Sequence, residues 1–232
     1  MPTCGSQIPI CDVPIRYDTY RGCSHACTYC FVKRLSDIRE VKIGESPKAL
    51  EDFIKGKRTK ITSWCDWDIP IHWGGMSDPF QPCEKIHKKS LEALKILKES
   101  NYPYIVSTKS ILPIDKEYIY IISGSSCVFQ ISAVSSKYDE YEKGASTYNQ
   151  RLGMMRVLAP VVKRLVVRVQ PYVLEVERDV IKSMDLYSKI GVYGIVIEGM
   201  KYKTKRKDTV RFEGDNVINF DMLKGSLNSV TP

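Results

Sequence analysis

Residues 14–34 read PIRYDTYRGCSHACTYCFVKR and combine a short apolar run with three closely spaced cysteines. The apolar run, 13–17, has the composition of a buried strand, and Cys23, Cys27 and Cys30 follow it within a few positions. The opening residues lack a secretory leader, so we expect a cytoplasmic protein whose thiols stay reduced. Its eight cysteines therefore predict metal binding, catalysis or burial rather than a disulfide framework.

Apolar strand-like runs alternate with amphipathic helix-like segments beyond this stretch. The predicted strands are 13–17, 69–73, 102–108, 127–134, 165–173 and 192–199, and the predicted helices are 46–57, 84–100, 115–124, 148–163 and 176–191. This order requires parallel strands joined by right-handed crossovers, because each helix returns the chain to the same edge. We predict an α/β fold, a partial (β/α)6 barrel of the TIM type rather than a complete eight-unit barrel.

Ligands of such folds bind at the carboxyl ends of the strands, and polar residues of this chain follow those ends. The candidates are Cys23 to Cys30 after the first strand, Ser77 and Asp78 after the second, Lys109 and Ser110 after the third, Gln170 near the end of the fifth and Glu198 near the end of the sixth. The sequence predicts one site that draws on several strands.

The length and composition of the chain predict one main domain, 1–200. We expect the extension that follows, 201–232, to form a hairpin or a covering segment. The extension begins KYKTKRK, and the whole chain of 232 residues carries a formal net charge of +8. A basic chain with aromatic residues among its cations, such as Tyr202, favours nucleic acid as a partner, although a basic run is more often a solvated surface. No window is apolar enough to cross a bilayer, so we expect no membrane contact.

Two metal sites fit the cysteine loop. Cys23, His25, Cys27 and Cys30 nominally offer zinc four ligands, but this spacing is unusual for a compact zinc module and no second Cys-x-x-Cys half-site follows. A cubane iron-sulfur cluster held by three thiolates instead keeps one iron open to another ligand. Both interpretations stay open on the residues alone.

The Cys-x-x-x-Cys-x-x-Cys spacing after the first strand of a partial barrel, with Tyr29 before the third cysteine, resembles the radical S-adenosylmethionine (SAM) superfamily. Residues 14–34, together with WGGMSDPFQPCEK (73–85) and STKS (107–110), look like its spore photoproduct lyase-like branch, more closely in the first half of the chain than in the second. The resemblance implies a [4Fe-4S] cluster on Cys23, Cys27 and Cys30. Its open iron binds the amino and carboxylate groups of SAM, and reductive cleavage yields a 5'-deoxyadenosyl radical that abstracts a hydrogen atom from the substrate.

The resemblance also implies SAM-binding residues. Gly74, Gly75 and Met76 replace the Gly-Gly-Glu-type edge that meets the SAM amino group in many relatives, so backbone carbonyls must act there. Lys109 is a candidate partner of the SAM carboxylate. The other candidates are Tyr29, Ser77, Asp78, Ser132, Arg168 and Gln170. Lys109 as a solvated lysine, Ser132 as a packing residue, Asp78 as a turn former and His25 as a residue that shapes the loop are the plainer alternatives.

Photoproduct lyases use a hydrogen-donating cysteine near the end of strand two, where this chain reads Gly74-Gly75-Met76. That departure puts lesion repair in doubt. Cys83, just past the Asp-Pro motif, is the candidate catalytic thiol at the mouth of the site. Cys4, Cys11, Cys65 and Cys127 are expected to be mostly buried thiols.

The sequence therefore predicts a radical SAM enzyme of the lyase or modification type that acts on nucleic acid, by DNA repair or base modification. It needs an electron donor such as flavodoxin or ferredoxin. The alternatives are a radical SAM enzyme that acts on a peptide or small metabolite, and a zinc-stabilised nucleic-acid-binding protein without activity.

Overall fold

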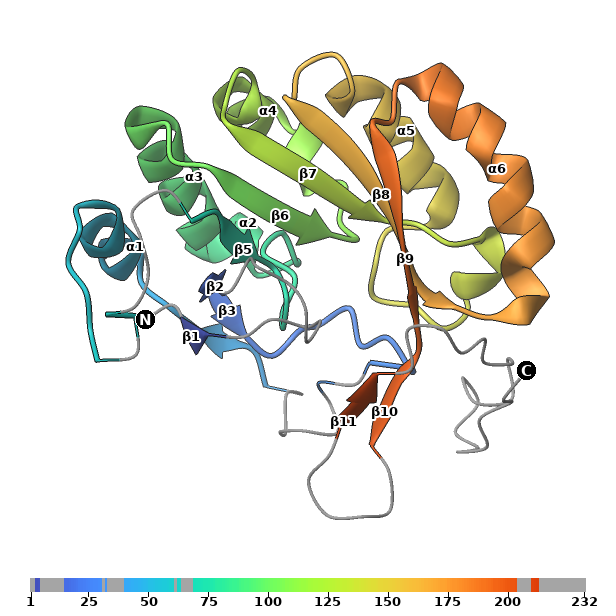
Figure 1. The fold of residues 1–232 in the computed structure, drawn as a ribbon, viewed down its shortest axis with the longest axis horizontal. Helices are drawn as coiled ribbons and strands as arrows, with labels where there is room; N and C mark the ends of the chain where they lie inside the picture. Colours follow the sequence, from blue (N-terminus) through green and yellow to red (C-terminus); the bar gives the residue numbers. More distant parts are fainter. Residues whose placement is uncertain are drawn as a thin grey trace.

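The structure, a computed structural model, describes residues 3–4, 15–30, 32, 40–60, 62–63, 69–203 and 210–212. Six parallel strands follow one another in chain order across one sheet: β2 (Ile15–Tyr17), β5 (Ile71–Trp73), β6 (Tyr104–Thr108), β7 (Cys127–Ser132), β8 (Arg164–Tyr172) and β9 (Gly194–Gly199). Strand β1 (Thr3–Cys4) adds an antiparallel edge beside β2. The sheet curves without closing (Figure 1), and all six predicted strands are confirmed.

Helices cover the outside of this curved sheet (Figure 1). They are α1 (Pro47–Ile54), α2 (Glu84–His87), α3 (Lys89–Ser100), α4 (Lys116–Ile122), α5 (Tyr148–Leu158) and α6 (Glu177–Ile190), with short 3₁₀ helices η2 (Leu112–Ile114), η3 (Ser136–Tyr138) and η4 (Leu174–Val176). Each α-helix lies within or beside a segment predicted to be helical, but α5 ends at Leu158 because Pro160 cannot continue it. All the crossovers of the predicted barrel are therefore present.

The prediction of one helix over 84–100 is wrong, because the chain forms two. Lys88 has a left-handed backbone (φ 53°) that ends α2 and starts α3 in a new direction. The Glu84 carboxylate then accepts the amides of Ser90 and Leu91, both at 2.9 Å, and so caps α3 from the preceding helix. A long-range acceptor thus replaces the capping side chain that Lys88 cannot supply.

Strand residues alternate between an apolar outer face and a polar inner face. Ile71, Trp73, Val106, Phe129 and Val167 are fully buried and pack toward the helices, as the two-residue period of a strand requires. The intervening positions face the concave side and carry hydrogen-bonding groups, including Ser107, Gln130, Ser132, Arg168 and Gln170. The concave side of the sheet is therefore polar toward the carboxyl ends of the strands.

Two pairs of short strands lie outside the main sheet. Strands β3 (Tyr20–Arg21) and β4 (Lys42–Ile43) pair antiparallel beside the cysteine loop, and β10 (Lys201–Lys203) pairs antiparallel with β11 (Val210–Phe212). The second pair lies in the predicted extension, whereas the basic residues 205–207 lie outside the described residues. The division at residue 200 stays a prediction. Among the described residues, no helix is both long and apolar enough to cross a membrane.

Candidate functional site

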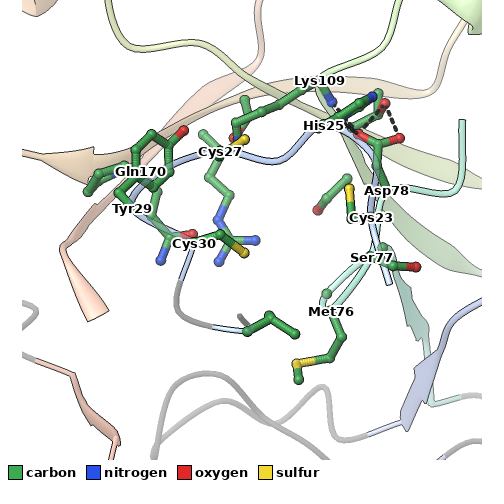
Figure 2. Close-up of a pocket in the computed structure, with 18 of the residues that line it drawn as sticks. Cys23, His25, Cys27, Tyr29, Cys30, Met76, Ser77, Asp78, Lys109 and Gln170 are labelled. Carbon is green, nitrogen blue, oxygen red and sulfur yellow. Dashed lines mark hydrogen bonds and ion pairs between the residues drawn. The ribbon is translucent and has the colours of Figure 1, made fainter. Parts of the chain in front are cut away.

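An open cavity lies at the carboxyl ends of the parallel strands. Figure 2 shows the sulfur atoms of Cys23, Cys27 and Cys30 around this space, with Lys109 and Asp78 on the same wall. The lining also includes the remaining predicted cofactor-binding residues: Tyr29, Gly74, Gly75, Ser77, Ser132, Arg168 and Gln170. The structure thus brings together the polar strand ends that the sequence singled out.

The loop that carries the three cysteines is held on two sides by hydrogen bonds to its backbone. Gln81 accepts the amide of Ser24 (2.9 Å) and donates to the carbonyl of Gly22 (3.1 Å). On the other side, the amide of Thr28 donates to the carbonyl of Tyr141 (2.9 Å). The loop is therefore fixed by both the segment after β5 and the segment after β7, which preorganises its thiols.

The three thiols are free cysteines that suit a metal cluster. Burial raises the pKa of Cys23 to about 12, with Asp78 adding to the effect, and burial raises the pKa of Cys27 to about 11. Binding of a metal centre would therefore release protons from these thiols. Three soft sulfur ligands around one cavity fit an iron-sulfur cluster.

A single metal ion fits this wall less well. Within the described residues, no three His, Cys, Asp or Glu side chains are gathered closely enough to hold one ion. Zinc bonds sulfur at about 2.3 Å, so its ligands must converge on one point, whereas the irons of a cubane are spread over a wider volume.

Asp78 is enclosed by protein donors. Its carboxylate accepts the hydroxyl of Thr108 (2.9 Å) and the amides of Lys109 (2.7 Å) and Phe80 (2.9 Å). His25 Nδ1 lies 3.4 Å from the same carboxylate, and burial lowers the pKa of this imidazole below its ordinary value. Asp78 therefore ties the cysteine loop to the end of β6, and His25 helps to shape that loop.

Ser77 is similarly engaged, since its hydroxyl donates to the carbonyl of Tyr20 at 2.6 Å. Both Ser77 and Asp78 line the cavity, but each already has a protein partner. In this arrangement they position the walls of the cavity, and their predicted contact with a cofactor stays a prediction.

The Gly74-Gly75-Met76 edge depends on a glycine. Gly74 has φ +86°, and a Cβ at this position would lie 2.4 Å from the carbonyl oxygen of Ser107 and 2.9 Å from Pro79 Cδ. The amide of Met76 donates to the Asp18 carboxylate at 3.3 Å. The backbone after β5 can therefore turn tightly against β6 and present its edge to the cavity.

We expect Gly74→Ala to lower the free energy of unfolding by at least about 2 kcal/mol, since it adds both backbone strain and a clash with main-chain atoms. Denaturant unfolding of the two proteins measures this. Gly153→Ala is the matched control, because a Cβ there meets nothing within 4 Å and the residue is helical. Equal losses at the two glycines would contradict the assignment.

The cations of the cavity differ in how they are paired. Arg168 Nη2 lies 2.8 Å from Glu198 Oε1, and Gln170 donates to the other oxygen of Glu198 at 2.8 Å. Lys109 instead donates to the neutral hydroxyl of Ser132 at 3.0 Å, and its Nζ lies 3.9 Å from the Glu142 carboxylate. Lys109 is therefore better placed than Arg168 to bind an anionic group.

Two buried charges behind this wall were not predicted from the sequence. Glu142 is 2% exposed and Arg151 is 1% exposed, and they form an ion pair of 2.5 Å. Glu142 stands in an acidic run, 139–142, that is typical of a solvated loop, and Arg151 stands in an ordinary helix. Neither carries a local signal of burial.

Cys83 is not among the residues that line the cavity. It precedes α2, where it is half-buried. Cys127 is buried at the start of β7, as expected, while Cys11 and Cys65 lie outside the described residues and only the backbone of Cys4 is described. The three clustered cysteines are thus set apart from the others by their place in the cavity.

Comparisons by sequence found no match, either to a family model or to a curated protein. Comparison by structure found similar proteins. A variant of spore photoproduct lyase with bound AdoMet and dinucleoside spore photoproduct superposes with a TM-score of 0.63 at 14% identity, over 83% of this chain and 58% of that one. The chain has the spore photoproduct lyase fold.

Streptococcus suis SuiB shares this fold as well. SuiB bound to S-adenosylmethionine matches with a TM-score of 0.60 at 12% identity, over 87% of this chain and 44% of that one. SuiB bound to precursor peptide SuiA matches with a TM-score of 0.60 at 13% identity, over 82% and 40%. The chain therefore spans less than two thirds of these proteins, and the predicted partial barrel of the radical SAM kind is confirmed as a fold.

Proposed function

We propose that this protein is a radical SAM enzyme. Cys23, Cys27 and Cys30 would hold a [4Fe-4S] cluster, and SAM would occupy the cavity beside them. The observation that carries the proposal is the convergence of these cysteines with Lys109 and Arg168 on one cavity, in a fold shared with proteins whose structures contain SAM. When bound, the cluster supplies the electron that cleaves a carbon-sulfur bond of SAM.

The protein's own residues would bind and orient SAM. Lys109 pairs with the SAM carboxylate. Backbone carbonyls of Gly74 to Met76 accept hydrogen bonds from the amino group of SAM. Ser132 on β7, with Arg168 and Gln170 on β8, lines the same cavity and would contact the ribose or the carboxylate. Tyr29 and the walls tied by Asp78 exclude water, which strengthens each polar contact.

We propose nucleic acid as the substrate. Support comes from the formal charge of +8, the basic start of the extension and the fold shared with a lyase solved with a dinucleoside photoproduct. A peptide is the second candidate, because the same fold occurs in SuiB with its precursor peptide. The electron donor would be a flavodoxin or ferredoxin, and the setting cytoplasmic.

Anaerobic reconstitution followed by reduction tests the proposal. We expect about four irons and four sulfides per chain and conversion of SAM to 5'-deoxyadenosine. Stimulation by oligonucleotides that weakens steeply with salt supports a nucleic-acid substrate, whereas stimulation by peptides alone supports the second candidate. Zinc without iron or sulfide would replace the proposal by a zinc-stabilised protein.

We expect Lys109→Ala to weaken SAM binding roughly 30-fold while the iron content stays unchanged, because the variant loses a cation in a half-dry cavity but keeps all three thiols. Equilibrium binding of SAM to the reconstituted protein measures this. Lys95→Ala, at an exposed position on α3, is the control. Unchanged SAM affinity in Lys109→Ala would remove Lys109 from the site.

A further inference from the structure

The buried ion pair behind the cavity wall joins the segment after η3 to helix α5. Glu142 Oε2 lies 2.5 Å from Arg151 Nη2, and both side chains are almost completely buried. Removing two charges from water is costly, and the cost is recovered only where each charge meets several well-placed partners. The other contacts of the pair therefore indicate what it positions.

The second oxygen of Glu142 faces the residues that line the cavity. Oε1 accepts the hydroxyl of Tyr29, and it lies 3.9 Å from Lys109 Nζ. The Lys109 ammonium also lies 5.9 Å from the centre of the Tyr29 ring. One carboxylate thus contacts both the cysteine loop and the candidate ligand of the SAM carboxylate.

Arg151 extends the same network to β7. Its Nη1 donates to the carbonyl of Ser132 at 2.6 Å, and the hydroxyl of Ser132 accepts from Lys109 at 3.0 Å. The contacts form a closed ring through Glu142, Arg151, Ser132 and Lys109. A closed ring restricts the Lys109 side chain more than any one contact does, because each member is already ordered by its neighbours.

The backbone around Glu142 supports the cysteine loop directly. The amide of Gly144 donates to the carbonyl of His25 at 3.1 Å, and a Cβ on Gly144 would lie 2.4 Å from the carbonyl oxygen of Ser24. The segment 141–144 therefore packs closely against residues between the first two cysteines. A shift of Glu142 would move the loop and Lys109 together.

We propose that Glu142 is a positioning residue of the SAM site, which holds Tyr29 and Lys109 in place and neutralises Arg151 so that Lys109 pairs with the carboxylate of the ligand. This inference rests on the proposed function, because it assigns SAM to the cavity. Without the Glu142 charge, Arg151 would lack its main counter-ion, and Lys109 would lose the contact that orients it. The site would then bind the zwitterionic amino-acid end of SAM less tightly.

Glu142→Gln tests the proposal, because it removes the charge and keeps the size of the side chain. The matched control is Glu140→Gln, a carboxylate two residues earlier that lies outside the ring. We would measure SAM affinity per cluster-loaded chain, iron and sulfide content, thermal unfolding, and both KM and kcat for the cleavage of SAM. The expected result for Glu142→Gln is SAM binding weakened about tenfold and a KM raised to match. Iron content and kcat stay close to those of the unchanged protein, and Glu140→Gln behaves like that protein in every assay.

A lower unfolding temperature with unchanged SAM affinity of the loaded chains would overturn the proposal, because it would show a purely structural ion pair. If Glu142→Gln fails to fold, the double variant Glu142→Gln with Arg151→Met is used instead, because it leaves no buried unpaired charge. Its SAM affinity is then compared with that of the unchanged protein, and equal affinities would overturn the proposal. Failure of the proposed function is separately visible, since the unchanged protein would then bind no SAM. The absence of SAM binding would overturn both the proposed function and the role of Glu142. Equal SAM affinity in the unchanged protein and in Glu142→Gln would overturn only the role of Glu142.

Discussion

Replacing Cys23, Cys27 or Cys30 by alanine, one at a time, is expected to abolish both the iron-sulfur cluster and the cleavage of SAM. The three thiols line one cavity on a loop fixed from both sides, so each would supply one ligand of the proposed cluster, and no other described cysteine lines the cavity to replace it. A cubane needs a thiolate on each iron that the protein holds. Iron should fall from about four per chain to near zero, and 5'-deoxyadenosine formation by more than about 100-fold.

Cys83→Ala is the control for the loss of a thiol. Cys83 is half-buried before α2 and does not line the cavity, so this variant should keep its iron and its sulfide, while its predicted role as the catalytic thiol stays a prediction. Metal and sulfide analysis after anaerobic reconstitution, with chromatography of the nucleoside product, separates the variants. A full complement of iron and unchanged SAM cleavage in any one of the Cys23, Cys27 or Cys30 variants would exclude the cluster as assigned.

The order of strands and helices was predictable because it depends on local patterns. Each strand of the sheet alternates or is apolar throughout, and each outer helix has an apolar face, so the period of the sequence specifies the element. Parallel pairing then follows from the right-handed crossover, which brings every strand end to the same edge. For this reason the sequence alone could place Lys109, Ser132 and Gln170 at one site.

The interior of the site was less predictable because it depends on contacts between segments far apart in the chain. Glu142 and Tyr29 are 113 residues apart, and nothing in the acidic run around Glu142 predicts that this carboxylate is buried. The break at Lys88 is similar, since helix propensity favours continuity across 84–100. The Glu84 carboxylate overrides that preference by capping the new helix. Tertiary hydrogen bonds of this kind leave no periodic trace in the sequence.

The contrast between local sequence patterns and long-range contacts also separates the cavity-lining residues by role. The motif residues Ser77 and Asp78 were expected to contact a cofactor, yet both side chains already hydrogen-bond to protein groups. A sequence motif thus marks the neighbourhood of a site, and only geometry separates the groups that hold its walls from those that reach the ligand.

Glu84→Ala is expected to cause a large loss of stability, because one buried carboxylate serves four donors. Glu84 is fully buried and accepts the hydroxyl of Tyr20, the hydroxyl of Tyr118 (2.8 Å) and the amides of Ser90 and Leu91. Burial, and then the hydrogen bond to Glu84, raise the pKa of both phenols, which therefore remain donors. Removing the carboxylate leaves these buried donors without their acceptor, each at a cost of about 1–3 kcal/mol before relaxation.

We expect a net loss of roughly 3–5 kcal/mol in the free energy of unfolding, which is a large share of the stability of an ordinary domain. Chemical denaturation of the apoprotein measures it, with Glu92→Ala as the control, because the Glu92 side chain is 46% exposed and forms an ion pair with Lys89 at the protein surface. The control should change stability by less than about 0.5 kcal/mol. A loss below about 1 kcal/mol in Glu84→Ala would mean that water replaces the carboxylate. If the larger loss is found, the Glu84 side chain holds three separate parts of the protein in place. These are Tyr20 at the base of the cysteine loop, the start of α3, and Tyr118 on α4. The loop that would hold the cluster is then stabilised from the outer helices as well as from the cavity.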